Sequence, residues 1–339
     1  MATLREIADK VGVSIATVSR VLNNDSGIVV TDETKVEIFQ VAEELNYKTA
    51  KQRKGKNKKK DYHVIGIVEM YDVVQQLEDP YYLLLKNVVD KNCFQNNIKV
   101  IKFFKEGNSY VSLEDKAVEG IIAIGKFDES EIDDLYQKTS NIVFVDSSPD
   151  DEIFDAVKIN FNLGVKQALK YLIKSGHKEI GFIGERNTFG DFKIPSLDAR
   201  LKYFLEYMQE EKILNEDYII NSPMNSKGGY ESIINYISKK KKMPTSFLAA
   251  NDSIATGVIR GLQENGYSIP DDVSIIGFND TIVSKYTNPP LTSIGVYVEE
   301  LAEEAVYLML ERLKNKRAYS KLVIIPTKLI ERESVKTLL

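Results

Sequence analysis

From Tyr62 onward, short runs rich in β-branched and aromatic residues alternate with longer amphipathic segments. The runs read HVIGIVEM, KVIKFFK, GIIAIG, NIVFVD, EIGFIG, SFLAAND and VSIIGFND. Such continuously apolar runs are typical of strands buried on both faces of a parallel sheet. The segments between them predict helices at residues 82–96, 163–174, 201–211, 253–265 and 299–313. Repeated strand–helix–strand units favour an α/β fold of doubly wound parallel sheets.

The α/β region is long for a single sheet. It contains about 275 residues, more than one such core usually uses. We therefore expect two α/β lobes. The extended stretch KINFN near Asn160 indicates where the chain passes from a strand of the first lobe into a new helix.

The first 47 residues predict three short helices. Thr3 and Glu6 have the spacing of a capping box. Gly12 ends the first helix, Ser14 caps the second, and Thr31 precedes two acidic residues that begin the third. The predicted inward-facing residues are Leu4, Ile7, Ala8 and Val11, then Val18, Val21 and Leu22, then Val36, Phe39, Ala42 and Leu45.

Charge divides the chain at the same place. Residues 1–60 hold 12 Lys and Arg against 8 Asp and Glu, net +4, whereas the remainder holds 33 against 42, net −9. Eight basic residues and no acidic residue lie between Lys48 and Lys60. The field of this run attracts a polyanion, although a solvated flexible linker is the default interpretation of such a segment alone.

Residues that metal centres and enzymes use are scarce. The single cysteine, Cys93, forbids an internal disulfide, and with only His63 and His177 a structural zinc cluster is not expected. The GxSxG, P-loop and GxGxxG motifs are missing, and His177 is typical of a helix-to-strand turn. A glycosidase carboxylate pair stays open as an alternative. We expect no catalytic residue, metal or cofactor.

The N-terminus and hydropathy predict a cytoplasmic protein. MATLREIADK is charged and patterned as a helix rather than as a leader peptide. No apolar stretch approaches the roughly 20 residues that a bilayer requires. We therefore expect a chain that is neither exported nor membrane-spanning.

Polar side chains follow the apolar runs, and ligands of open parallel sheets bind beyond the carboxyl ends of strands. These residues are Asp72, Asp146, Ser147, Ser148, Glu185, Arg186, Asn251, Asp252, Asn279 and Asp280. They can form paired hydrogen bonds with neighbouring hydroxyls, while aromatic rings cover the C–H side of a sugar. The available aromatic residues are Tyr81, Tyr82, Phe161, Phe189 and Phe192. For Ser147, Asp252 and Asp280, capping of a helix is an equal alternative.

Two blocks of the sequence resemble one family. LREIADKVGVSIATVSRVLNN, followed by AEELNY, strongly resembles the headpiece of the LacI/GalR family of bacterial transcriptional repressors. KSGHKEIGFIG, DARLKYF, FLAANDSIATGVIRGLQENG, IPDDVSIIGFND and NPPLTSI resemble its periplasmic-binding-protein-like core. QLEDPYYL, with Asn279 where many members have aspartate, is most similar to the branch of the evolved β-galactosidase repressor and the galactose repressor. The resemblance covers nearly the whole chain.

The resemblance implies that residues 14–22 form a recognition helix in the major groove. Ile15 and Ala16 would contact thymine methyl groups, and Arg20 would pair with a guanine edge. Thr3, Thr17, Ser19, Asn23 and Tyr47 would hold phosphates. The predicted DNA-binding set is completed by Ser14, Lys51, Arg53, Lys54 and Lys56. Family members usually carry a hinge-helix leucine that wedges into the minor groove, but TAKQRKGKNKKK contains no leucine, so only electrostatic contact with phosphates is expected here.

The resemblance also implies an effector site and a domain plan. Asp146, Arg200, Asn251 and Asn279 match effector-binding positions of relatives, and Asp72, Tyr81 and Phe161 complete the predicted site. A surface helix arginine is the structural alternative for Arg200. The predicted domains are the head at 1–47, a hinge at 48–61, a first lobe at 62–160 plus about 292–323, and a second lobe at 161–291 plus about 324–339.

These features predict a dimeric, sugar-responsive transcriptional repressor of a carbohydrate operon, with galactose or a β-galactoside as effector. One recognition helix contacts too few base pairs for genomic specificity, so a homodimer on double-stranded, near-palindromic operator DNA is expected. Effector bound between the lobes would shift the relation of the two heads. The rivals are a sugar-binding transport component, against which the basic head argues, and a galactoside-active enzyme.

Overall fold

The computed structural model describes residues 3–23, 25, 28, 30–45, 47, 62–114, 116–189, 195–315 and 317–338. The chain divides into two compact units, residues 1–61 and 62–339, and each has its own hydrophobic core. Among the described residues, no helix is both long and apolar enough to cross a membrane.

The first unit contains the three predicted helices, α1 (Leu4–Val11), α2 (Ile15–Leu22) and α3 (Asp32–Glu44). The capping box is confirmed, because the Thr3 hydroxyl accepts from the Glu6 backbone and the Glu6 carboxylate accepts from the Thr3 backbone. Gly12 ends α1 with a left-handed φ of 73°, a conformation that favours glycine. Ser14 and Thr31 cap the next two helices, as predicted.

The core of the first unit corrects one prediction. Its buried residues are Ile7, Ala8, Val18, Val21, Ile38 and Ala42. Val36 and Phe39 of α3 were expected to face inward, but their side chains are 55% and 46% exposed. Each helical residue turns by about 100°, so the stripe through Ile38 and Ala42 leaves both of them outside.

A parallel sheet forms the first lobe of the second unit, with strand order β15-β7-β6-β5-β1-β2. Its strands are β1 (Val64–Glu69), β2 (Lys99–Lys102), β5 (Gly120–Ile124), β6 (Ile142–Val145), β7 (Asp155–Ile159) and β15 (Leu322–Ile325). The run KVIKFFK, predicted as one strand, divides after Lys102. Its second part, β3 (Phe104–Glu106), forms an antiparallel hairpin with β4 (Ser109–Val111).

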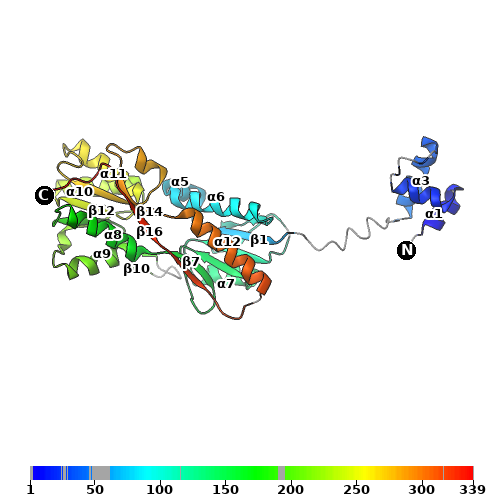
Figure 1. Ribbon diagram of the computed structural model, residues 1–339, viewed down its shortest axis with the longest axis horizontal. Coiled ribbons are helices and arrows are strands. Elements are labelled where there is room, and N and C mark those ends of the chain that lie inside the picture. The colour runs from blue at the N-terminus through cyan, green and yellow to red at the C-terminus, as the bar shows by residue number, and fades with distance from the viewer. Residues whose placement is uncertain are drawn as a thin grey trace. The chain divides into compact units, whose positions relative to one another are not determined.

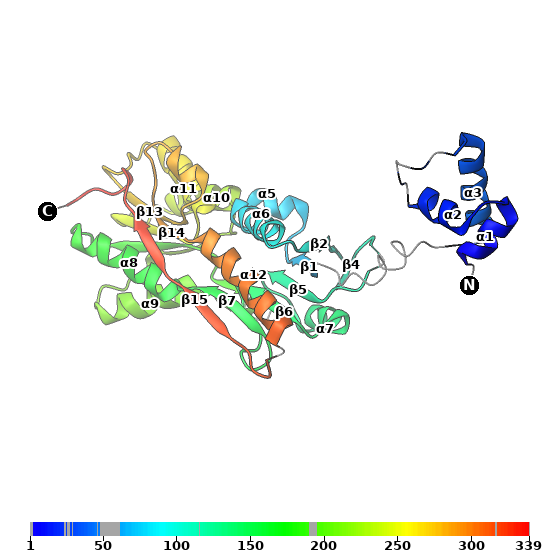
Figure 2. The same cartoon turned by 45° about the vertical axis from the view of Figure 1, so that its right-hand side comes forward.

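Helices cover this first sheet. They are α5 (Val73–Glu78), α6 (Pro80–Gln95), α7 (Glu129–Lys138) and α12 (Val298–Asn315). The neighbours α6 and α12 pack against each other, as both ribbon views show (Figure 1, Figure 2). The predicted helices at 82–96 and 299–313 are confirmed as α6 and α12.

The second lobe is built on another six-stranded sheet, with order β11-β8-β12-β13-β14-β16. Its strands are β8 (Ile180–Gly184), β11 (Ile219–Asn221), β12 (Ser246–Ala249), β13 (Ser274–Asn279), β14 (Thr292–Val296) and β16 (Thr327–Ile330). All neighbours are parallel except the antiparallel pair of β14 and β16. A short hairpin joins β9 (Asn187–Phe189) to β10 (Pro195–Leu197).

Two pairs of helices cover the second sheet. The pair α8 (Phe161–Lys174) and α9 (Ala199–Glu210) lies on one face, and α10 (Ser226–Ser238) with α11 (Asp252–Glu264) lies on the other (Figure 2). The 3-10 turns η1 (Glu216–Tyr218) and η2 (Ile282–Lys285) complete the lobe. The structure confirms the α/β fold of doubly wound sheets and the helices predicted at 163–174, 201–211 and 253–265.

Within the described residues, the chain crosses between the lobes three times. The first lies near Asn160, as predicted, between β7 and α8. The crossing predicted at about residue 292 is corrected, because β14 pairs with β13 in the second sheet and the chain returns to the first lobe only at α12. The third crossing passes from β15, which ends at Ile325, to β16, which begins at Thr327. The backbone N–H of Asn160 donates to the Ile325 carbonyl (2.9 Å) and ties two crossings together.

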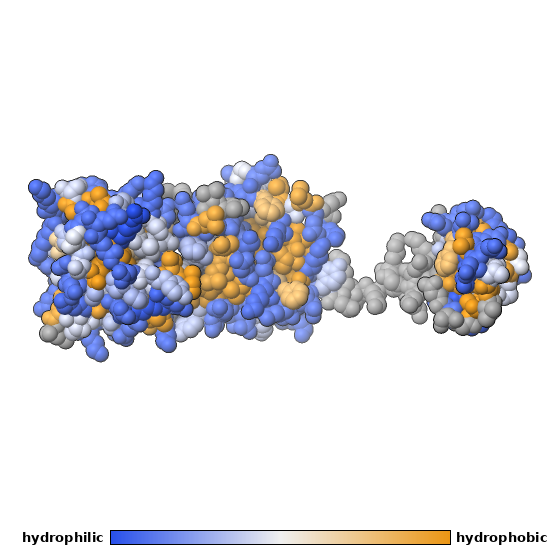
Figure 3. Space-filling model, turned by 90° about the horizontal axis from the view of Figure 1, so that it is seen from above, coloured by the Kyte–Doolittle hydropathy of each residue, from blue (hydrophilic) through white to orange (hydrophobic). Residues whose placement is uncertain are grey.

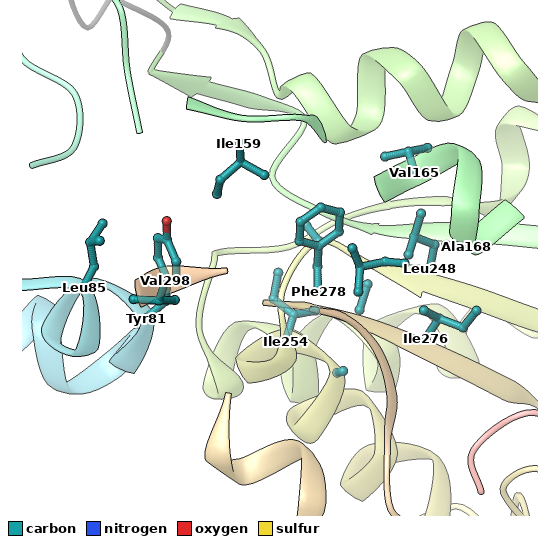
Figure 4. Close-up of a cluster of buried hydrophobic side chains, with 14 of the residues drawn as sticks. Tyr81, Leu85, Ile159, Val165, Ala168, Leu248, Ile254, Ile276, Phe278 and Val298 are labelled. Atoms are coloured by element: carbon teal, nitrogen blue, oxygen red, sulfur yellow. The ribbon is translucent and has the colours of Figure 1, made fainter. Parts of the chain in front are cut away.

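Buried side chains from both lobes belong to one hydrophobic cluster. Figure 4 shows Tyr81 and Leu85 of the first lobe, and Ile254 and Phe278 of the second, as members of this cluster. Because each fully buried aliphatic or aromatic side chain contributes roughly 1.5–3 kcal/mol, this cluster supports the strand ends that meet between the lobes.

Candidate ligand-binding cleft and DNA-contacting helix

A cavity of about 360 Å³ lies between the lobes, and side chains from both of them line it. This volume lies within the range of small-molecule sites. Five of the predicted effector-site residues line it, namely Tyr81, Asp146, Phe161, Arg200 and Asn279. Of these, Asp146 follows β6 and Asn279 ends β13, so the strand-end rule accounts for two side chains that are far apart in the sequence.

Arg200, the second residue of α9, is held by a rigid set of contacts. Its Nε and Nη2 donate to the two carboxylate oxygens of Asp198 (2.9 and 2.8 Å), and Nη1 donates to the Ala250 carbonyl (2.8 Å). The guanidinium carbon lies 5.2 Å from the ring centre of Phe161 and 5.8 Å from that of Phe278. Three of the five N–H groups are thus bonded within the described part of the chain, which leaves two for a ligand. The surface alternative for Arg200 does not hold, because the side chain is 13% exposed.

The Arg200–Asp198 pair is charged. Burial alone would raise the pKa of Asp198, but the Arg200 charge and hydrogen bonds outweigh burial and hold the pKa below its ordinary value. Burial likewise opposes the charge of Arg200, and the nearby Asp198 carboxylate more than compensates, so the pKa of Arg200 is raised. The second lobe therefore presents a fixed cation with paired donors.

Asp146 forms the opposite wall, at the end of β6. Tyr82 donates its hydroxyl to Asp146 Oδ2 (2.8 Å). The other oxygen, Oδ1, is buried and has no hydrogen-bond partner among the described residues, and the same holds for the hydroxyl of Tyr81. Burial raises the pKa of Asp146, and the Tyr82 hydrogen bond opposes that shift. An unpaired buried acceptor is costly, so this wall is suited to a ligand that donates a hydrogen bond.

Asn279 ends β13 and reaches the cavity from the second lobe with a strained backbone. Its φ is 100°, and that of Asp146 is 66°; both values lie in a region that side-chain-bearing residues rarely adopt. Arg332 fixes the adjacent Asp280 through Nη2 (2.6 Å to Oδ1). Such strain is concentrated at ligand sites where the surroundings impose it.

Two predicted site residues do not line the cavity, and the structure corrects them. Asp72 is exposed and accepts a hydrogen bond from the Gln75 backbone (2.9 Å) at the beginning of α5. Asn251 is buried behind the wall, where Oδ1 caps α11 and Nδ2 donates to the carbonyl of Met224 (3.0 Å), itself a cavity residue. Both perform the capping role that competes with ligand contact at strand ends.

The capping alternative fails for the three residues to which it was assigned. Asp252 accepts from the Ser293 hydroxyl (2.6 Å) and from Thr281, so it joins α11 to the loops after β13 and before β14. Asp280 pairs with Arg332, and Ser147 donates to the Gly125 carbonyl. None of the three lines the cavity. Of the proposed aromatic residues, Tyr82 lines it, whereas Phe192 and the Phe189 side chain lie outside the described part of the chain.

The sequence interpretation missed several charged cavity residues. Asp79 caps α6 and is buried, and burial raises its pKa to about 6. Asp198 caps α9 in the same way. Lys126 directly follows the run GIIAIG, with Gly125 between it and the end of β5, so the strand-end rule would have found it. Lys105 lies on β3, in the part of the chain where one strand was expected instead of two.

The α2 helix of the first unit presents the predicted base-reading residues at its surface. Ile15 and Ala16 are exposed at its beginning, where Ser14 Oγ accepts from the Thr17 backbone (3.1 Å). Arg20 donates from Nε to Asp25 (2.8 Å), and among the described residues its terminal nitrogens form no further hydrogen bond.

The other predicted DNA contacts are partly accounted for. Thr3, Ser19 and Asn23 lie at or near helix ends, with Asn23 Nδ2 donating to the Ser19 carbonyl (2.8 Å). Tyr47 packs partly against the core of the unit. Lys51, Arg53, Lys54 and Lys56 lie outside the described residues.

Comparisons with known proteins cover the whole chain. Residues 3–50 match the description "Bacterial regulatory proteins, lacI family", and residues 169–335 match "Periplasmic binding protein-like domain". The chain is 35% identical over 337 residues to the HTH-type transcriptional regulator GalR of Streptococcus thermophilus, covering 99% of this chain and 100% of that protein. It is 35% identical over 342 residues to the HTH-type transcriptional regulator GanR of Bacillus subtilis, with coverage of 99% and 100%.

Solved structures show the same fold. The complex of transcriptional regulator CelR with cellobiose has 20% identity and a TM-score of 0.68, covering 98% of this chain and 100% of that one. The lac repressor dimer bound to operator and the anti-inducer ONPF has 20% identity and a TM-score of 0.66, with 99% of each chain covered.

Proposed function

The chain belongs to the LacI family of bacterial regulatory proteins and is a DNA-binding transcriptional regulator, and we propose that it represses a carbohydrate-utilisation operon under the control of a sugar bound in the cleft. The resemblance of its sequence to the galactose-repressor branch makes galactose or a β-galactoside the proposed effector.

The observation that carries the sugar proposal is the chemistry of the two cavity walls. Arg200 offers two N–H donors, and Asp146 Oδ1 is a buried acceptor with no partner among the described residues. A polyol carries hydroxyls that both donate and accept, so one ligand satisfies both walls. Phe161 and Tyr81 add aromatic surface to the same cavity. Cellobiose and ribose are named as ligands in structures of fold neighbours.

The proposed assembly is a homodimer on a near-palindromic operator. One short recognition helix reads few base pairs, and a twofold dimer doubles the site. Hydrophobic residues gather on one face of the core (Figure 3). Exposed apolar side chains occur on α5 and α6 (Leu77 and Leu84) and at η2 (Ile282 and Tyr286), and burial of such surface favours association.

Footprinting of the DNA upstream of the chain's own gene tests the proposal. Two protected half-sites are expected about one helical turn apart, and their protection should change with D-galactose or a β-galactoside. Protection that no sugar of a broad panel alters would contradict effector control.

Arg20→Ala tests the base-reading role of α2. Loss of a guanine contact should weaken operator binding by roughly 1–3 kcal/mol and binding to random DNA by less. Arg5→Ala, which removes the same charge from α1, is the matched control. Equal losses on both DNAs would make Arg20 a phosphate contact.

A further inference from the structure

We infer that the cleft selects unphosphorylated sugars and rejects sugar phosphates. The inference rests on the proposed function and specifies the ligand class of the same site. It follows from the charges around the cavity and from the atoms that are already bonded there.

Among the described residues, three basic side chains line the cavity, and two of them pair with carboxylates. Arg200 is held by both oxygens of Asp198, which is itself a cavity residue. Lys105 Nζ lies 2.7 Å from Glu131, whose side chain is fully buried. Both cations are therefore already balanced by a buried carboxylate, so a phosphate that reached them would also bring its negative charge close to Asp198 or Glu131.

The third basic side chain, Lys126, faces an excess of acids. Asp79, Asp146 and Glu185 line the same cavity, and none has a basic group within ion-pair distance among the described residues. Burial raises the pKa of all three carboxyls, that of Asp79 to about 6, because it disfavours the charged form. Among the described residues that line the cavity, Lys126 therefore faces three acidic side chains before any ligand enters.

Hydrogen-bond chemistry points the same way. Asp146 Oδ1, on a residue that is 8% exposed, has no donor among the described residues. A sugar hydroxyl can donate to this oxygen. A phosphate dianion has only acceptor oxygens, so it cannot donate to Asp146 Oδ1. It also adds nearly two negative charges beside the acidic side chains of the cavity. Placing like charges together is a strong means of excluding the wrong ligand.

Calorimetry with the full-length protein at pH 7.5 tests the inference directly. The probes are D-galactose and lactose against D-galactose 1-phosphate and D-galactose 6-phosphate. We expect both phosphates to bind at least about 100-fold more weakly than the better of the two free sugars, because juxtaposed like charges dominate the difference.

The double variant Asp79→Asn with Glu185→Gln tests whether these two acidic side chains cause the weaker binding of sugar phosphates. It replaces two acidic cavity side chains by neutral amides, and asparagine keeps the α6 cap. The ratio of phosphate to sugar affinity should narrow by about 10-fold. Asp133→Asn with Glu299→Gln removes the same charge from exposed helix positions outside the cavity and should leave that ratio unchanged.

The outcomes separate the inference from the proposed function. Sugar phosphates that bind as well as the free sugars would overturn the inference and leave a sugar-responsive regulator intact. If neither sugars nor phosphates bind to a protein that still binds its operator, the sugar proposal fails and the inference fails with it. The affinities of the wild-type protein for free sugars and for sugar phosphates test the inference even if the double variant does not fold.

Discussion

The two walls of the cleft differ in how complete they are. On the second-lobe wall, Asp198, the Ala250 carbonyl and two phenylalanine rings hold Arg200 in place. On the first-lobe wall, Tyr82 satisfies one oxygen of Asp146, while the other oxygen and the Tyr81 hydroxyl have no partner among the described residues.

The pKa values of the acidic side chains also differ between the two walls. The pKa of Asp198 lies below its ordinary value because Arg200 outweighs burial, whereas burial raises the pKa of Asp79 and Asp146 on the other wall. A ligand therefore finds a prepared donor on one side and unmet acceptors on the other. Only a ligand that contacts both lobes can satisfy the hydrogen-bonding groups of both walls. Its binding therefore favours the conformation in which the lobes lie together.

Arg200→Ala should have the largest effect. It removes the ligand's fixed donors and leaves the Asp198 carboxylate buried without its partner. Sugar affinity should fall by at least about 3 kcal/mol, while operator affinity persists because the first unit is a separate compact body. Calorimetry and a gel-shift titration measure the two effects. Arg260→Ala, an exposed arginine of α11, is the control; a variant that binds sugar normally would remove Arg200 from the site.

Asp79→Asn should change the pH dependence of stability. The pKa of Asp79 is raised to about 6 in the folded state, so the native protein holds this proton more tightly than the unfolded chain does. Its contribution to stability is complete below about pH 4 and is lost as pH rises through 6, a change of roughly 3 kcal/mol. Urea unfolding between pH 4 and 7.5 should show a smaller decline for the variant than for the wild type. If the free energy of unfolding declines equally with pH in both proteins, then ionised Asp79 does not destabilise the folded state.

Tyr82→Phe tests whether the hydrogen bond from Tyr82 to one carboxylate oxygen of Asp146 supports sugar binding. Without the 2.8 Å hydrogen bond, neither carboxylate oxygen keeps a tyrosine donor, and sugar affinity should fall by about 10-fold. Tyr136→Phe, on an exposed tyrosine of α7, should bind sugar as the wild type does. If the two variants behave alike, the first-lobe wall does not depend on Tyr82.

Glu78→Ala should have the smallest effect. Glu78 of α5 accepts a hydrogen bond from Nδ2 of Asn225, the cap of α10, across the cleft (3.0 Å). Because the bond is exposed, its loss should weaken sugar binding only two- to five-fold, or about 0.5–1 kcal/mol. Glu78→Gln keeps an acceptor oxygen and should restore the affinity. Equal affinities for the alanine and glutamine variants would show that this bond does not help to hold the lobes together.

The sequence was most informative where a physical rule acts locally. Helix caps at Thr3, Ser14 and Thr31 and the apolar strand runs were predictable because each depends on neighbouring residues. The strand-end rule found Asp146 and Asn279 because parallel strands deliver their carboxyl ends to one edge.

Other features depend on distant partners and escaped prediction. Asp79 and Asp198 look like ordinary helix caps in the sequence, and only the folded chain brings them beside Arg200 and the cavity. Asn251 shows the reverse, because it was expected in the cavity but caps α11 behind the cavity wall. The exposure of Val36 and Phe39 likewise depends on which face of α3 meets the other helices.

Operator binding measured with and without sugar shows whether a ligand in the cleft controls DNA binding. Fluorescence anisotropy with a labelled DNA fragment from upstream of the gene gives the Kd in each state. Saturating D-galactose or a β-galactoside should change the operator Kd by at least about 5-fold, which corresponds to the lower end of typical coupling energies. An operator Kd that stays constant while calorimetry shows the same sugar bound would contradict control of DNA binding through the cleft.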